Sequence, residues 1–210
     1  MSPQLAVFIV AVLAIVGWFA LGTHVNIRKG HRYLDWLQAG LPLAGEKTTL
    51  RWLGSSVVQL KIEKALEPFR RVEVLVVLEP RDVPPLWLLS RLRGRRDLLI
   101  VRTELRFIPK SQFEILNPHA WSAQAVEREV LQQQWQLTPS GDLPFRVYAL
   151  PPVAHAADFV AEVTHPELPL VRIGARRAAN ALEVQWHLPA RPATSSHSIF
   201  ESVLRLARRV

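Results

Sequence analysis

The feature that most constrains this chain is an uncharged apolar run near its N-terminus, residues 5–21, which reads LAVFIVAVLAIVGWFAL. As a helix rising about 1.5 Å per residue, the run is ~26 Å long. Continuing it to Val25 adds ~6 Å, which is enough to cross a hydrocarbon core of about 30 Å. In lipid each backbone N–H and C=O must find its partner within the segment, so a helix is expected. We therefore predict a membrane anchor over residues 5–25.

Two other interpretations of the run are open. A buried core helix is disfavoured because such helices carry a polar stripe, whereas apolar side chains cover every side of this one. A cleaved signal peptide is the stronger alternative, with a weak cleavage site at residues 20–22. Against it, residues 1–4 contain no Lys or Arg and the apolar run is longer than a usual signal-peptide core. An uncleaved anchor is the prediction.

The charges that flank the run predict its orientation. Residues 1–4 are uncharged, whereas Arg28, Lys29 and Arg32 follow the run closely. Positive charge is retained on the cytoplasmic side, so residues 1–4 are expected outside and the rest of the chain in the cytoplasm. Aromatic side chains near these charges suit the interfacial belt. The predicted membrane-interface residues are Trp18, Arg28, Lys29, Arg32, Tyr33 and Trp36.

Composition limits the architecture of the chain beyond the anchor. Of 210 residues, 49% are hydrophobic, which suffices for one packed core in addition to the apolar run. The chain has no cysteine, so disulfides and thiolate metal sites are excluded and a reducing compartment is favoured. The formal net charge of +8 lies wholly after the anchor, because Arg28 is the first charged residue.

Residues 26–47 are predicted to form a juxtamembrane connector, and residues 48–210 one cytoplasmic domain. A short helical face over residues 30–38 has two placements that we leave open: in the headgroup layer, or packed on the domain. From residue 48 the apolar period changes to two, which predicts strands. Helical patterns interrupt them. The first is capped by Asp82 and runs to about Leu92, and the others cover residues 122–134, 154–164 and 199–209.

The predicted fold class is α+β, with a sheet of eight or nine mostly antiparallel strands and the helices packed on one face. The halves 48–134 and 135–210 suggest a tandem β-β-α-β-β-α duplication. Within them Val101 aligns with Val171, and Ile115 aligns with Val184 at almost the same offset. Accidental similarity between two α+β segments is the alternative.

The sequence carries no established catalytic or nucleotide-binding signature. The sequence contains no P-loop, no G-x-G-x-x-G, no H-E-x-x-H and no G-x-S-x-G. Its histidines lack metal-ligand spacing, and Glu63, Glu73 and Glu79 are interpreted as solvated strand charges. We therefore predict no catalytic residue, no cofactor and no metal site, and we expect that the chain is not an enzyme.

One cluster of basic residues exceeds the background. It consists of seven basic residues, Arg91, Arg93, Arg95, Arg96, Arg102, Arg106 and Lys110, together with Trp87 just before them. Arginines gathered at the end of a predicted helix are typical of contact with anionic headgroups or an acidic protein partner. Arginines in a last helical turn also suit the helix dipole, which is a purely structural role. Nucleic acid is disfavoured, because aromatic residues do not alternate with the arginines as in stacking platforms.

These patterns favour a single-pass membrane protein whose cytoplasmic domain works by binding. The expected role is an accessory or assembly subunit of a membrane-associated complex, with membrane lipid and an unidentified protein as partners. The alternative is a module that binds anionic lipid or nucleic acid through the arginine cluster at the membrane surface. Phosphate binding would weaken steeply with salt, whereas an apolar docking surface would not.

The topology is directly testable. Protease added to intact cells should leave the domain whole, because the flanking charge places it inside. N-terminal sequencing of the purified protein should begin near Met1 or Ser2. A mature N-terminus near Thr23 would establish a signal peptide instead.

Overall fold

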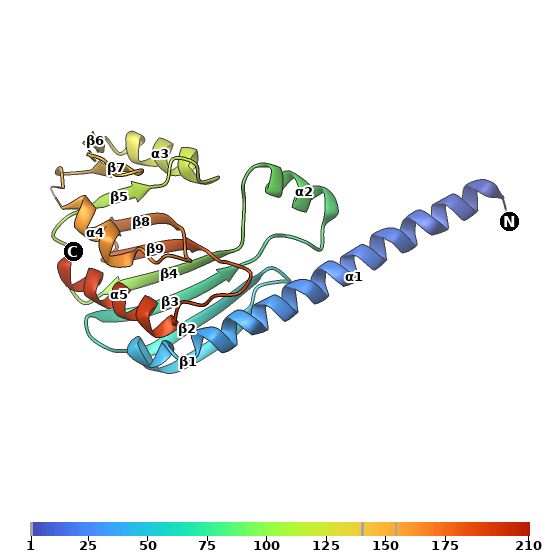
Figure 1. Cartoon of the computed structure of the whole chain (residues 1–210), viewed down its shortest axis with the longest axis horizontal. Coiled ribbons are helices and arrows are strands. Elements are labelled where there is room, and N and C mark those ends of the chain that lie inside the picture. The colour runs from blue at the N-terminus through green and yellow to red at the C-terminus, as the bar shows by residue number, and fades with distance from the viewer. Residues whose placement is uncertain (1, 140, 154) are drawn as a thin grey trace.

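The computed structural model describes residues 2–139, 141–153 and 155–210, and shows a long N-terminal helix leading into a sheet with shorter helices around it (Figure 1). The helices are α1 (Pro3–Leu37), α2 (Pro84–Leu92), α3 (Ala123–Gln132), α4 (Ala156–Val163) and α5 (Ser196–Arg209), with a 3-10 turn η1 (Leu41–Leu43). The strands are β1 (Gly45–Trp52), β2 (Val57–Ala65), β3 (Phe69–Val77), β4 (Leu98–Leu105), β5 (Phe113–Leu116), β6 (Gln136–Thr138), β7 (Arg146–Ala149), β8 (Leu170–Arg176) and β9 (Ala181–His187). Residue 154, at the start of the predicted helix 154–164, lies outside the described residues.

The nine strands form one sheet in the order β1-β2-β3-β4-β9-β8-β5-β7-β6. Every neighbouring pair is antiparallel. The predicted α+β class and antiparallel sheet are therefore confirmed. The period of two accounts for β2, where Val58, Leu60 and Ile62 are buried while Lys61 and Glu63 are exposed.

The tandem duplication is not confirmed. In the first half β3 and β4 are neighbours, and β5 lies away from both. In the second half β8 and β9 are neighbours, and β7 is separated from β8 by β5. The alignment of Val101 with Val171 and of Ile115 with Val184 makes β4 equivalent to β8 and β5 equivalent to β9. Strands β8 and β9 are neighbours whereas β4 and β5 are not, so the two halves have different strand orders.

The main core lies between one face of the sheet and the helices α1, α4 and α5 (Figure 1). Alternate residues of the strands point into it, for example Val74 of β3 and Trp186 of β9. The helices contribute Phe159 from α4 and Phe200 from α5, among others. Burying a side chain of this size is worth about 1.5–3 kcal/mol, so this face supplies most of the hydrophobic stabilisation.

The expectation that all helices pack on one face is wrong for α3. A second, smaller core contains Leu116, Val126, Val130, Trp135 and Tyr148. Leu116 of β5 points away from the main core, since its neighbour Ile115 points into it. Helix α3 therefore covers the opposite face, over β5 and β7.

Helix α1 is continuous through the predicted anchor and well into the predicted connector. Its C-terminal turns pack on the domain, with Tyr33 and Leu37 fully buried. Gly40 comes next, in close contact with α5, where an added Cβ would lie 2.4 Å from the ring of Phe200. Of the two placements left open for residues 30–38, packing on the domain is the observed one, and the connector is not a separate segment.

The N-terminal half of α1 projects away from the sheet (Figure 1). Within the described residues α1 is the one helix long and apolar enough to cross a membrane, and only 6% of its apolar window is buried. An anchor and a signal sequence meet this criterion equally.

A chain of ion pairs crosses the second face of the sheet. At its centre Glu114 of β5 is 0% exposed and accepts hydrogen bonds from Arg172 at 2.7 and 2.8 Å and from Arg176 at 2.9 Å. Gly174 makes room for this carboxylate, because a Cβ there would lie 2.7 Å from both of its oxygens. Arg176 also lies over the ring of Trp135, with 4.6 Å to the centroid.

We predict that Glu114→Gln destabilises the protein by about 3–5 kcal/mol, because two arginines would lose the charge that compensates them in a buried site. Urea denaturation in detergent measures the change in free energy of unfolding. The matched control is Glu63→Gln: Glu63 pairs with Lys47 at 3.1 Å on the exposed surface, so its loss should cost below about 1 kcal/mol. Equal effects of the two changes would contradict the structural role of Glu114.

Candidate functional site

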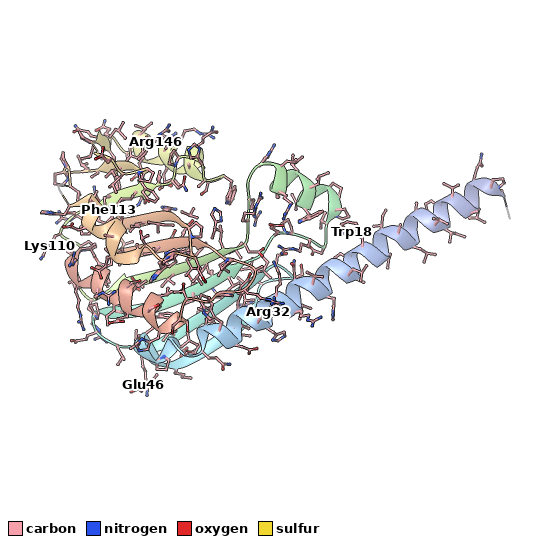
Figure 2. The ribbon with its side chains drawn as sticks, viewed as in Figure 1. Trp18, Arg32, Glu46, Lys110, Phe113 and Arg146 are labelled. Carbon is pink, nitrogen blue, oxygen red and sulfur yellow. The ribbon has the colours of Figure 1, made fainter. Side chains whose placement is uncertain are left out.

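The eight residues of the predicted basic cluster lie in three separate places. Trp87, Arg91, Arg93, Arg95 and Arg96 belong to α2 and the turn after it. Arg102 lies on the second face of the sheet, in β4. Arg106 and Lys110 follow the other end of β4, and Figure 2 shows Lys110 far from Trp18 of α1.

Two members of the cluster have structural contacts that account for them. Arg102 donates to Glu183 at 2.6 Å and to Glu73 at 3.4 Å, as part of the ion-pair chain on the sheet. Arg106 donates to the carbonyls of Phe69 at 3.0 Å and Ala65 at 3.3 Å. The group near α2 is therefore the part of the cluster that still calls for a functional explanation.

Helix α2 forms where the sequence predicts it. Pro84 and Pro85 occupy its first two positions, where a missing N–H costs nothing and the fixed φ suits a helix. Gly94 ends it with a φ of +79°, in the left-handed region that glycine adopts without strain. The helix is thus defined at both ends by local sequence.

The polar side of α2 faces the protein. The indole N–H of Trp87 donates to Oε2 of Glu79 at 2.8 Å, and Arg91 donates to both oxygens of the same carboxylate at 3.2 and 3.3 Å. Ser90, on the same side, is buried. Glu79 itself is only 2% exposed, so its interpretation as a solvated charge is wrong.

The apolar side of α2 faces outward. Its leucines are exposed by about half or more, and Leu92 reaches 76%. The exposed apolar residues of this segment are Val83, Leu86, Leu88, Leu89 and Leu92. This arrangement is the reverse of an ordinary surface helix, whose apolar side packs on the core.

Helix α2 contacts α1 near the end of the apolar run. The rings of Trp18 and Trp87 lie 6.1 Å apart, and the Trp18 indole N–H donates to the carbonyl of Arg81 at 2.9 Å. Gly22 permits this approach, because a Cβ there would lie 2.3 Å from the same carbonyl oxygen. An open cavity of about 240 Å³ remains between the two helices, lined by Trp18, Leu21, Gly22, Val25, Arg81 and Trp87.

A buried polar network joins α1 to the sheet directly beyond this contact. Arg81 binds both oxygens of Asp97, at 3.0 and 3.1 Å, and Lys29 of α1 donates to Asp97 at 2.8 Å. Asn26 of α1 is fully buried, donates to the carbonyl of Glu79 at 3.1 Å and accepts from Arg81 at 3.1 Å. The network therefore holds α1 in one orientation on the domain, since each partner satisfies another.

The electrostatics of the network follow from its pairing. Burial alone would raise the pKa of Asp97, but hydrogen bonds from Arg81 and Lys29 outweigh it and lower the pKa below its usual value. Burial, with the nearby Asp97 charge, raises the pKa of Tyr33 to about 12. Its hydroxyl donates to the carbonyl of Pro189 at 2.9 Å, so Tyr33 is a neutral structural contact at physiological pH.

The predicted membrane-interface residues fall into two groups in the structure, those with exposed side chains and those that bond to the domain. Trp18 and Arg28 keep exposed side chains. Trp36 donates to the carbonyl of Thr194 at 2.8 Å, and Arg32 donates to the carbonyl of Ala190 at 3.3 Å. Together with Tyr33 and Lys29, these two residues join α1 to the domain, so their contacts are with protein.

The remaining arginines surround the C-terminal end of α2. Arg96 donates to the carbonyls of Arg91 and Arg95, at 3.1 and 2.8 Å, and so helps to close the helix. Arg95 lies over the ring of Trp121, with 5.2 Å to its centroid. Arg93 is exposed. Their charge is thus concentrated at the rim of the exposed leucine surface.

Sequence reasoning missed Asn26, Glu79 and Asp97, the centre of the network. Partial signals existed: Glu79 ends a continuous apolar strand, and Asp97 stands between an arginine-rich turn and the apolar start of β4. Asn26 is a polar residue that directly follows the predicted span. The sequence does not indicate which residues these three side chains contact, because their partners are distant along the chain.

Comparisons with known proteins add no assignment. No protein-family model matches the chain, and no curated protein matches it significantly. In the described part of the chain, no three His, Asp or Glu side chains come together as a metal site would require.

We predict that Asp97→Asn destabilises the protein by about 3 kcal/mol at neutral pH, because Arg81 and Lys29 lose their buried counter-charge. Since the folded pKa of Asp97 is lowered, its contribution is present above an unfolded pKa of about 4 and is lost as the pH falls further. The difference from the unchanged protein should therefore shrink at acidic pH. Denaturation in detergent at several pH values measures it.

The matched control for this prediction is Asp35→Asn. Asp35 is an exposed aspartate on the packed part of α1. Its replacement should change stability by less than about 0.5 kcal/mol at every pH. An effect of Asp97→Asn that does not vary with pH would contradict an ionised Asp97 in the folded protein.

Proposed function

We propose that this protein is a single-pass, membrane-anchored accessory or assembly subunit whose cytoplasmic domain binds a protein partner. The observation that carries the proposal is the second face of β2, β3 and β4. There Leu75, Val77 and Ile100 are half-buried. Gln59 and Gln185 lie beside them on the neighbouring strands, and the charged pair of Glu73 and Arg102 lies two positions along. An apolar centre with a polar rim is the usual composition of a protein interface.

The charges on this face favour protein over nucleic acid. Arg102 pairs with Glu73 and Glu183, and Arg71 lies 4.0 Å from Glu104. Both signs are thus interspersed and largely neutralise one another. A nucleic-acid surface would instead gather unpaired positive charge along one track.

The rigid junction between α1 and the domain supports a role as a subunit. A flexible tether would let the domain face any direction, whereas the continuous helix and the buried Asn26 and Asp97 contacts hold one direction. With α1 in a bilayer, the open sheet face would be presented at a set height and angle. Such pre-orientation lowers the entropic cost of assembling with another membrane-bound protein.

The same junction supports an anchor that stays attached. Trp18 bonds to Arg81, and Gly22 packs on the same loop. Cleavage near Thr23 would remove both contacts and leave the loop uncovered. The positive residues after the run continue to favour a cytoplasmic domain.

The ion pairs of the buried carboxylates also favour binding over catalysis. Glu79 contacts Arg81 and Arg91, Asp97 contacts Arg81 and Lys29, and Glu114 contacts Arg172 and Arg176. For Asp97 the hydrogen bonds from its two cations lower the pKa, so this carboxylate is a poor proton carrier at neutral pH. No cofactor or metal is part of the proposal.

The proposal is tested by site-specific photo-crosslinking of the full chain in its native membrane. A crosslinker at Leu75 or Ile100 should give one adduct of defined mass, because these residues lie at the centre of the proposed interface. The same group at His197, exposed on α5, should not. Adding Lys61→Glu, a charge reversal at the rim, should lower the adduct yield severalfold. Equal labelling from all three positions would overturn the interface.

A further inference from the structure

We infer that α2 is a second membrane contact: its leucine side inserts into the headgroup layer beside α1, and the arginines at its C-terminal end bind anionic lipid headgroups. The inference rests on the proposed anchor, since a bilayer must surround the N-terminal half of α1. It adds a lipid-binding site that the protein-binding proposal does not require.

The inverted orientation of α2 is the first argument. Trp87, Ser90 and Arg91 turn toward Glu79 and the polar network, so the helix cannot rotate its leucines inward without breaking those bonds. Five apolar side chains are left facing outward on a single short segment. Contiguous exposed apolar surface of this kind marks a binding surface.

The depth of α2 is the second argument. Its Trp87 contacts Trp18, which lies seven residues before the end of the predicted span at Val25. At about 1.5 Å per residue, that position is ~10 Å inside the end of the span, and the apolar side of an interfacial helix reaches a similar depth, about 5–10 Å, below the headgroup boundary. Helix α2 therefore lies level with the membrane surface, where amphipathic helices bind and tryptophan is enriched.

The charge around α2 is the third argument. Residues 83–96 contain four arginines and no acidic residue. The acidic neighbours are occupied, because Asp82 accepts from Ser55 and Asp97 binds Arg81 and Lys29. Arg93 is exposed and Arg95 is half-buried over Trp121, and neither pairs with these carboxylates, as expected for contact with anionic headgroups.

Continuity with α1 decides for lipid over a further protein as the occupant. Trp87 of α2 lines one cavity together with exposed residues of the anchor, Leu21 at 69% and Val25 at 42%. The cavity between α1 and α2 is lined mainly by apolar side chains of the same two helices. Because this apolar surface continues directly from the predicted membrane span, the lipid around the span is the occupant that would contact it.

The test exploits the absence of cysteine, which allows single labels on the full chain. The variants Leu92→Cys, Val10→Cys and Leu50→Cys each carry one environment-sensitive fluorophore. Leu92 lies on α2, Val10 within the anchor, and Leu50 on β1 as an exposed control at 47%. The protein is reconstituted into phosphatidylcholine vesicles, with or without phosphatidylglycerol, that contain lipids spin-labelled at the headgroup or deep in the acyl chain.

The label at Leu92 should shift to the blue and lose most of its emission to the headgroup quencher. The emission of the label at Val10 should be quenched by the spin label deep in the acyl chain. The emission of the label at Leu50 should be quenched by neither spin label. Quenching at Val10 with none at Leu92 overturns the α2 contact and leaves the anchor intact. No quenching at Val10 overturns the anchor, and the α2 contact falls with it.

The arginine part of the inference has its own readout. Phosphatidylglycerol should increase quenching at Leu92, and high salt should reverse that gain. Adding Arg93→Gln should reduce the gain, whereas Arg208→Gln, an exposed arginine on α5, should leave it unchanged. A gain that survives Arg93→Gln together with high salt overturns the headgroup contact.

Discussion

The bidentate bond between Arg81 and Asp97, with Lys29 and Asn26 of α1 joined to it, is the interaction on which the rest of this structure depends. It is placed where a helix with an apolar N-terminal half meets a folded sheet. Buried ion pairs add little net stability compared with apolar packing, because desolvation offsets the attraction. Their directional bonds instead specify one geometry. Here the geometry specified is the angle between the candidate membrane span and the domain.

Helix α2 takes its orientation from this network. Glu79 attracts Trp87 and Arg91, so the polar side of the helix turns inward and the leucines turn outward. In water alone such an arrangement would be costly, since each exposed leucine forgoes the free energy of burial. The same arrangement becomes favourable beside a bilayer. The polar junction and the exposed leucines are thus two consequences of one set of hydrogen bonds.

The antiparallel sheet explains why the basic cluster does not act as one surface. Strand β4 carries Arg102 in its middle, and α2 and Arg106 lie beyond its opposite ends. An eight-residue strand separates those ends by about 26 Å, more than twice the Debye length at physiological salt. Arg102 is then neutralised by Glu73 and Glu183 on neighbouring strands. The predicted cluster therefore divides into a balanced pair of charges on the sheet face, two basic residues after β4 and a basic rim at α2.

Local pattern in the sequence by itself determined the apolar run, the antiparallel α+β class and the position of α2, because period, proline and glycine act within a few residues. Only the tertiary structure decided that residues 30–37 join the core, that α3 covers the second face and that Glu79 is buried. It also decided which arginines are compensated. The physical reason is separation along the chain: Asn26 meets Glu79 across 53 positions and Lys29 meets Asp97 across 68, so neither pairing leaves a trace in local periodicity.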